Sequence, residues 1–207
     1  MLSASTALAF FAASVLLALV PGPDNVFVLL HAAAHGARAG LLVVLGLCSG
    51  LLFHTAAVAL GLAALLATSS AAFTFLKILG AAYLLWLAWL SWRAAAGLQD
   101  TETPPPLGAP QTYLRGVLMN ISNPKVALFF LAFLPQFVEP AGGPVALQIL
   151  QLGGVFMLAT LLTFGAIALL AGRFGQLLLH SPHAQVRLNR LASVVFAGLA
   201  LRLVLGA

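Results

Sequence analysis

Charged residues and cysteine are both scarce in this chain of 207 residues. Charged side chains make up 6% of the sequence and hydrophobic residues 62%, with a mean hydropathy of +1.11. Soluble domains have about 25% charged and about 45–50% apolar residues, so a soluble enzyme is excluded and the net charge of +5 does not indicate nucleic-acid binding. The single Cys48 cannot form an internal disulfide.

Two common sequence signals are also missing. Met1–Val20 is apolar but has no Lys or Arg near its start, so it lacks the basic region of a signal peptide, and we expect a retained first transmembrane helix. No Gly-Lys pair of a phosphate-binding loop is present, since Lys77 follows Leu76 and Lys125 follows Pro124. Direct ATP hydrolysis by this chain is therefore not expected.

Long apolar segments fill almost the whole chain. A membrane-spanning helix needs about 20 mostly apolar residues. Six segments qualify, at about Ser5–Ala34, Gly40–Ala67, Phe73–Ala95, Tyr113–Phe137, Val145–Ala171 and Leu188–Gly206. A polar, Pro-rich linker at Gly97–Thr112 and a polar connection at Gly172–Arg187 separate some of them. We predict an all-α polytopic membrane protein, in which six transmembrane helices form a single transporter domain over residues 1–207.

Two of these segments are interrupted by polar residues. The breaks are Leu19–Asn25, with the sequence Leu-Val-Pro-Gly-Pro-Asp-Asn, and Asn120–Lys125, with the sequence Asn-Ile-Ser-Asn-Pro-Lys. Each combines a proline with a side-chain amide, and the charges that follow the two prolines are opposite. A broken helix is tolerated in a membrane where it is buried in protein or lines a cavity, and ionisable residues in a span indicate function.

Proline and cap residues predict how each break is built. Proline suits the first position of a helix, where its missing N–H costs nothing. Pro23 and Pro124 are therefore predicted to start half-helices, with Gly22 and Asn123 as the cap residues.

The charged residues then fall in the first turn of each half-helix, near the positive end of its dipole. This position favours Asp24 and disfavours Lys125, so the lysine needs an anion, either Asp24 itself or a substrate carboxylate. We predict a zwitterionic amino acid with its carboxylate near Lys125 and its ammonium on Asp24. In the structural alternative, Asp24 only caps a helix and Lys125 extends to the membrane interface.

Other polar residues are candidates for the same site. His54 could relay the coupling proton, although a lone histidine in a span is more often a packed residue. The hydroxyls of Thr55 and Thr160 more often bond their own helix backbone. The predicted substrate-binding set is Pro23, Asp24, Asn25, Asn120, Asn123, Pro124 and Lys125, with Asp24 and His54 as candidates for proton coupling. Neither a cofactor nor a bound metal is expected.

The two halves of the chain resemble each other. Gly22–Leu29 resembles Asn123–Phe130, and further apolar stretches match in the same order. Two halves of three helices each must have opposite orientations, so we predict two inverted repeats, at about 1–96 and 113–207, joined by the linker 97–112. Interrupted segments at corresponding positions indicate the binding site of a transporter.

Basic residues near the predicted helix ends indicate the orientation. The connections between segments one and two, three and four, and five and six hold six of them, and the opposite side holds two. The six are Arg38, Arg93, Arg115, Arg173, Arg187 and Arg190, and the two are Lys77 and Arg202. Because cytoplasmic loops are enriched in Lys and Arg, we predict that the linker is cytoplasmic and that both termini are external.

Four motifs resemble one known family over nearly the whole chain. They are Pro21–Asp24, Asn123–Lys125, Phe133–Phe137 (Phe-Leu-Pro-Gln-Phe) and Gly80–Leu84 (Gly-Ala-Ala-Tyr-Leu), and together they resemble the LysE/RhtB translocators. The resemblance implies a secondary active exporter of amino acids or close derivatives in the bacterial inner membrane, driven by the proton gradient. Its expected partners are a small zwitterionic amino acid, protons and the lipid bilayer, and no nucleic acid. Whether it forms a homo-oligomer stays open.

Two other classes of function are alternatives. A branch of the wider superfamily handles cadmium, so a heavy-metal exporter is an alternative, but Cys48 and scattered histidines provide no thiolate cluster for a soft metal. An intramembrane hydrolase would need Ser49 and His54 to meet. Five residues apart on one helix they are separated by about 140°, so they face apart, and we expect a transporter rather than an enzyme.

Overall fold

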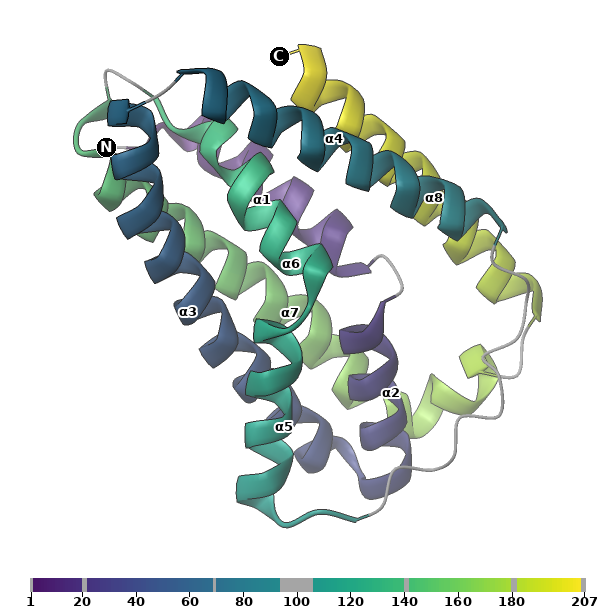
Figure 1. Cartoon of the computed structure of the whole chain (residues 1–207). Helices are drawn as coiled ribbons and strands as arrows, with labels where there is room; N and C mark the ends of the chain where they lie inside the picture. Colours follow the sequence, from purple (N-terminus) through teal and green to yellow (C-terminus); the bar gives the residue numbers. More distant parts are fainter. Residues whose placement is uncertain are drawn as a thin grey trace.

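The computed structural model describes residues 2–19, 22–68, 70–93, 106–139, 142–179 and 182–205. Within these ranges, the side chains of residues 62–68, 70, 72, 73, 76, 172–179, 182, 184, 185 and 188 are outside the description. Over the described ranges the protein consists of helices joined by short connections, with no strand (Figure 1). The predicted all-α class is confirmed for this part of the chain.

The helices follow the predicted apolar segments. In chain order they are α1 (Ala4–Leu19), α2 (Pro23–His35), α3 (Ala37–Thr68), α4 (Ser70–Arg93), α5 (Ala109–Ile121), α6 (Pro124–Leu128), η1 (Phe129–Phe133), η2 (Leu134–Phe137), α7 (Val145–Leu179) and α8 (Pro182–Leu205). Helices α1 and α2 form the first predicted segment, and α5 to η2 form the fourth.

Two predicted connections have the wrong bounds, because helices continue beyond the apolar runs. Helix α5 begins at Ala109, with Gly108 as its cap and a proline in its first turn, so the end of the predicted linker 97–112 is helical. The polar connection predicted at 172–187 is instead the end of α7, up to Leu179, followed by α8 from residue 182. A helix needs only its backbone hydrogen bonds, so polar side chains do not end it. Linker residues 94–105 lie outside the described residues.

The described helices support two to four membrane spans. Two stretches are long and apolar enough to cross a bilayer alone, Ala37–Gly61 in α3 and Val145–Ala171 in α7. Two bent pairs pass the same test as single spans: α1 with α2, bent by 64°, and α5 with Pro124–Phe137, bent by 47°. The full set of six spans stays a prediction.

Helix packing brings the ends of the broken helices together. Helix α3 packs on α7, and α4 packs along α8 (Figure 1). Helices α1 and α2 pack on α7, whereas α5 packs closely on α3. A Cβ atom added to Gly46 would lie 2.2 Å from the carbonyl oxygen of Tyr113, and one added to Gly116 would lie 2.5 Å from that of Val43. These glycines allow the two backbones to approach, which places the middle of α5 against α3.

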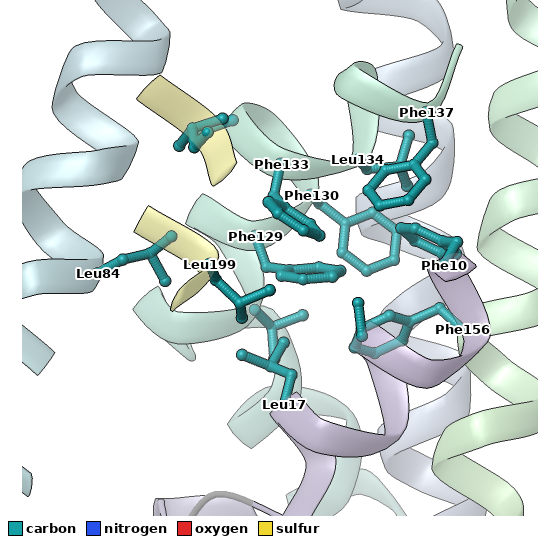
Figure 2. Close-up of a cluster of buried hydrophobic side chains, with 14 of the residues drawn as sticks. Phe10, Leu17, Leu84, Phe129, Phe130, Phe133, Leu134, Phe137, Phe156 and Leu199 are labelled. Carbon is teal, nitrogen blue, oxygen red and sulfur yellow. The ribbon is translucent and has the colours of Figure 1, made fainter. Parts of the chain in front are cut away.

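The helical segment after the second break changes its winding. It is α-helical to Leu128, widens to a π-helix over Phe129–Phe133 and tightens to a 3-10 helix over Leu134–Phe137. Pro135 accounts for the change, because a proline has no N–H and clashes inside a regular helix. Six buried rings gather around this segment and are called the aromatic cluster below (Figure 2): Phe10, Phe129, Phe130, Phe133, Phe137 and Phe156.

Candidate functional site

Both breaks restart a helix in the predicted way. Gly22 has an extended backbone and precedes α2, whose first residue is Pro23. Asn123 caps α6, because its side-chain oxygen accepts the backbone N–H of Lys125 at 3.0 Å, and Pro124 occupies the first helical position. The local preferences of proline and of cap residues are therefore sufficient to locate both helix starts.

Asp24 and Lys125 line the same small cavity, which we call the central cavity. Their relative exposures are 1% and 7%, and the two charges interact. The alternative in which Lys125 extends to the membrane interface does not hold, because its side chain is buried in the protein. Pro21 of the first break lies outside the described residues. The other lining residues come from α1, α5, α6 and α7 and are Leu17, Ala18, Asn120, Val126, Phe156, Thr160 and Phe164.

The ammonium of Lys125 binds the end of a different helix. Its Nζ donates to the carbonyl oxygen of Leu17 at 3.3 Å. Leu17 is in the last turn of α1, where carbonyls lack helical partners and the helix dipole is negative. A Cβ on Gly22 would lie only 3.1 Å from this Nζ, so the glycine leaves room for the lysine. Lys125 thus avoids the positive end of its own helix and caps the negative end of α1.

Asn25 also caps α1. Its Nδ2 donates to the carbonyl oxygen of Ala18, so two side chains from beyond the break bind the last turn of this helix. We predicted Asn25 as a substrate ligand, and the structure shows that its N–H group has a structural role. Its Oδ1 makes no hydrogen bond within the described part of the chain.

At the second break, His54 contacts the end of α5. Its Nε2 lies 3.1 Å from the carbonyl oxygen of Asn120, and its ring packs on Phe130 with centroids 5.7 Å apart. His54 is not among the residues that line the central cavity. Asn120 is, and its side chain lies beside the Asp24 carboxylate. His54 is therefore connected to Asp24 through Asn120 and not directly.

The two threonines behave differently. Thr55 donates to the carbonyl oxygen of Leu51 at 2.7 Å, which is the backbone bond expected of a threonine in a span. Thr160 is buried and lines the central cavity.

Sequence reasoning missed the apolar wall of this cavity. Phe156 and Phe164 of α7 line it, and Phe156 also belongs to the aromatic cluster, with its ring centroid 5.3 Å from that of Phe129. Leu17 forms part of the wall near the end of α1 (Figure 2). Apolar residues in apolar helices carry no distinguishing signal, because the sequence does not show which side of a helix faces a cavity.

Four buried polar atoms near the breaks have no hydrogen-bond partner within the described residues. They are Asp24 Oδ1, Asn25 Oδ1, Asn120 Oδ1 and Asn123 Nδ2. Such atoms are rare in proteins, and each costs about 1–3 kcal/mol. Three are acceptors and one is a donor. A primary ammonium has three N–H donors and a carboxylate accepts from several sides, so a zwitterion matches this set of groups.

The central cavity is very small. Its volume is about 10 Å³, which is room for about one water molecule. An amino acid is much larger, so the cavity must widen before a ligand of this class binds.

The residues of the two alternative functions are not assembled in the described part of the chain. No group of three His, Cys, Asp or Glu residues there is arranged to hold a metal ion. The hydroxyl of Ser49 bonds the Leu45 carbonyl at 3.1 Å and accepts from Tyr113 at 2.7 Å, whereas His54 faces Asn120. Ser49 and His54 therefore have different partners.

Comparison with known proteins gives a consistent result. The model of the LysE type translocator family matches residues 15–207. A homoserine/homoserine lactone efflux protein of Salmonella typhimurium is 33% identical over 165 residues, which is 80% of each chain. A leucine efflux protein of Salmonella choleraesuis is 29% identical over 206 residues, 94% of this chain and 92% of the relative. An uncharacterized membrane protein of Vibrio cholerae is 36% identical over 194 residues, 92% of each chain. No solved structure matches the chain.

The match to the family model includes both breaks and every residue that lines the central cavity. The family and the named efflux relatives are transport proteins and not enzymes. The chain therefore belongs to the LysE type translocator family.

Proposed function

We propose that this protein is a secondary active exporter of a small amino acid or a close derivative across the bacterial inner membrane, with the central cavity as its substrate site. One observation carries the proposal: Asp24 and Lys125 are buried in the same cavity, next to polar atoms without partners. A zwitterion has the two charges that this cavity needs. Two relatives are named for efflux of homoserine or homoserine lactone and for efflux of leucine, which supports this substrate class.

Each group of the substrate has a matching set of side chains. The ammonium is bound by the Oδ1 atoms of Asp24 and Asn120, and the carboxylate by the ammonium of Lys125, and all three residues line the central cavity. When substrate enters, Lys125 exchanges the neutral carbonyl of Leu17 for a carboxylate. Hydrogen bonds between two charged groups are stronger than those to a neutral acceptor, so this exchange favours binding and releases the end of α1.

The wall of the cavity favours a neutral side chain. Val126, Phe156 and Phe164 are apolar, and among the described residues that line the cavity Asp24 alone is acidic. A basic amino acid would bring a second cation without a partner into a buried site, which is costly. We therefore expect neutral amino acids to be preferred over lysine or arginine.

We assign the coupling proton to Asp24, with His54 as a second candidate behind Asn120. A substrate carboxylate on Lys125 draws the lysine charge away from Asp24, which then accepts a proton more readily. Asp24→Asn should keep part of the substrate exchange but lose transport driven by a pH gradient. Counterflow and gradient-driven uptake in the same proteoliposomes measure both. Unchanged gradient-driven uptake in Asp24→Asn would exclude Asp24 from coupling.

The proposed architecture is a pair of inverted repeats, α1–α4 and α5–α8. Proline starts both α2 and α6 after a break, α3 packs on its proposed counterpart α7, and α4 packs on α8, as expected around a two-fold axis. We place both termini outside, the linker 97–112 in the cytoplasm and Glu139–Gly143 outside. Labelling of single cysteines from each side, in a Cys48→Ala background, tests this topology. A linker cysteine labelled only from outside would reverse it.

The function is tested by counterflow with labelled homoserine and leucine in proteoliposomes, with labelled lysine and cadmium efflux in parallel. Wild type should show saturable exchange of a neutral amino acid, and Lys125→Gln should lose it. Lys77→Gln is the matched control, because it removes a lysine from α4, which does not line the cavity. Cadmium efflux without amino-acid exchange would support the metal-exporter alternative and overturn the proposal.

A further inference from the structure

A second cavity with both charges lies at the opposite end of α1, and we call it the outer pocket. Its volume is about 300 Å³, and its lining includes Thr6, Gln136, Phe137, Glu139 and Arg202. These residues come from the start of α1, from η2 and the connection after it, and from the last turn of α8. A pocket of this size is within the range of small-molecule sites, about 300–1,000 Å³.

The carboxylate of the outer pocket is held in place. Thr6 Oγ1 and Ser3 Oγ both donate to Glu139 Oε1, the latter at 2.9 Å. Gln148 accepts the backbone N–H of Glu139 at 2.9 Å and donates to its carbonyl at 2.9 Å. The hydrogen bonds from Thr6 and then Ser3 lower the pKa of Glu139, which keeps it ionised at neutral pH. The carboxylate is therefore charged and its position is fixed.

The cation of the outer pocket is oriented by an aromatic ring. The guanidinium of Arg202 lies over the ring of Phe137, 4.6 Å from its centroid, which is the geometry of a cation–π contact. A planar guanidinium presents its N–H donors along its edges and matches a carboxylate in shape. The outer pocket thus repeats the groups of the central cavity: one carboxylate, one cation and one amide.

The aromatic cluster connects the two cavities. Phe137 lines the outer pocket and its ring centroid lies 5.0 Å from that of Phe10. Phe10 is 5.8 Å from Phe129, which is 5.3 Å from Phe156, a lining residue of the central cavity. Figure 2 shows these rings in sequence, from Phe137 past Phe10 to Phe156. A continuous set of contacting aromatic rings therefore runs from one cavity to the other.

We propose that the outer pocket is a second binding site for a small zwitterionic amino acid, with the ammonium on Glu139 and the carboxylate on Arg202. Exported substrate binds there after it leaves the central cavity and passes the aromatic cluster. This inference rests on the proposed function and on the external location assigned to the Glu139 connection.

Equilibrium binding of labelled L-homoserine and L-leucine to the purified full-length protein tests the inference. Wild type should bind two molecules per chain. Arg202→Gln removes a charged hydrogen-bond donor, so it should weaken amino-acid binding at the outer site by at least about tenfold. This variant should then bind one molecule per chain. Arg190→Gln is the matched control, because Arg190 is also on α8 and also lies over an aromatic ring, Trp92, at 5.7 Å. This variant should still bind two molecules.

A variant of the central cavity distinguishes the outer site from the proposed function. Lys125→Gln should still bind one molecule per chain, and the double variant Lys125→Gln/Arg202→Gln should bind none. Binding of one molecule per chain that Lys125→Gln abolishes and Arg202→Gln leaves unchanged would overturn the outer site but keep the proposed function. Wild-type protein that binds neither amino acid would overturn both. If Lys125→Gln does not fold, the outer site is tested by comparing wild type with Arg202→Gln and Arg190→Gln. Equal amino-acid binding by all three proteins would overturn the outer site.

Discussion

The central cavity and the outer pocket contain the same kinds of charged groups, but only the central pair is buried. Asp24 and Lys125 are almost completely shielded from solvent around a cavity of about 10 Å³. Arg202 is exposed at a pocket of about 300 Å³. A buried charge depends on its partner because water cannot solvate it, whereas a surface charge is solvated and screened. Similar residues should therefore control folding at the first site and mainly ligand binding at the second.

The largest expected effect is at the central pair. Asp24→Ala or Lys125→Ala leaves one buried charge unpaired, which costs about 3–5 kcal/mol of unfolding free energy. The double variant should recover part of this stability because no lone charge remains, while transport stays absent in all three. Membrane level, melting temperature in detergent and counterflow measure the effect.

The corresponding variants of the outer pocket, Glu139→Ala, Arg202→Ala and their combination, are the controls and should change the melting temperature little. Additive losses for Asp24→Ala and Lys125→Ala would mean that the two central charges act independently.

An intermediate effect is expected for the two asparagines that follow and precede the prolines of the breaks. Asn25→Ala leaves the Ala18 carbonyl of α1 without its bond, which costs about 1–3 kcal/mol. Asn123→Ala removes a helix cap, which costs about 1 kcal/mol.

Serine distinguishes these two roles. Asn123→Ser should restore the melting temperature because serine also caps helices, whereas Asn25→Ser should not, since its shorter side chain does not reach Ala18. Equal rescue at both positions would contradict the role of Asn25 as the partner of the Ala18 carbonyl.

The smallest expected effect is the acid dependence of Glu139. Its hydrogen bonds from Thr6 and Ser3 lower its pKa, so its contribution to stability is present above the ordinary pKa of about 4.3 and is lost as the pH falls below it. The difference in melting temperature between wild type and Glu139→Gln should be constant above about pH 5 and should shrink in acid. A difference that grows in acid would contradict this assignment.

At each break, the start of the following helix can be predicted from the sequence, but the partners of the preceding helix end cannot. Pro23, Pro124 and the caps Gly22 and Asn123 were located correctly, because these preferences concern neighbouring residues only. The ends of α1 and α5 were not explained, because their carbonyls are bound by residues far away in the chain. Helices α5 and α8 start earlier in the chain than predicted. Hydropathy marks the limits of an apolar segment, and a helix can extend beyond those limits.

The sequence by itself determined an all-helical chain of apolar segments, two breaks with opposite charges, and membership of the LysE type translocators. These properties depend on composition or on neighbouring residues, and not on contacts between residues that are distant in the sequence. Only the tertiary structure decided that Lys125 binds the carbonyl of Leu17 and that His54 contacts Asn120. It also decided that Glu139 and Arg202 share a pocket. The physical reason is that helix packing sets which faces meet, and a uniformly apolar sequence does not specify those faces.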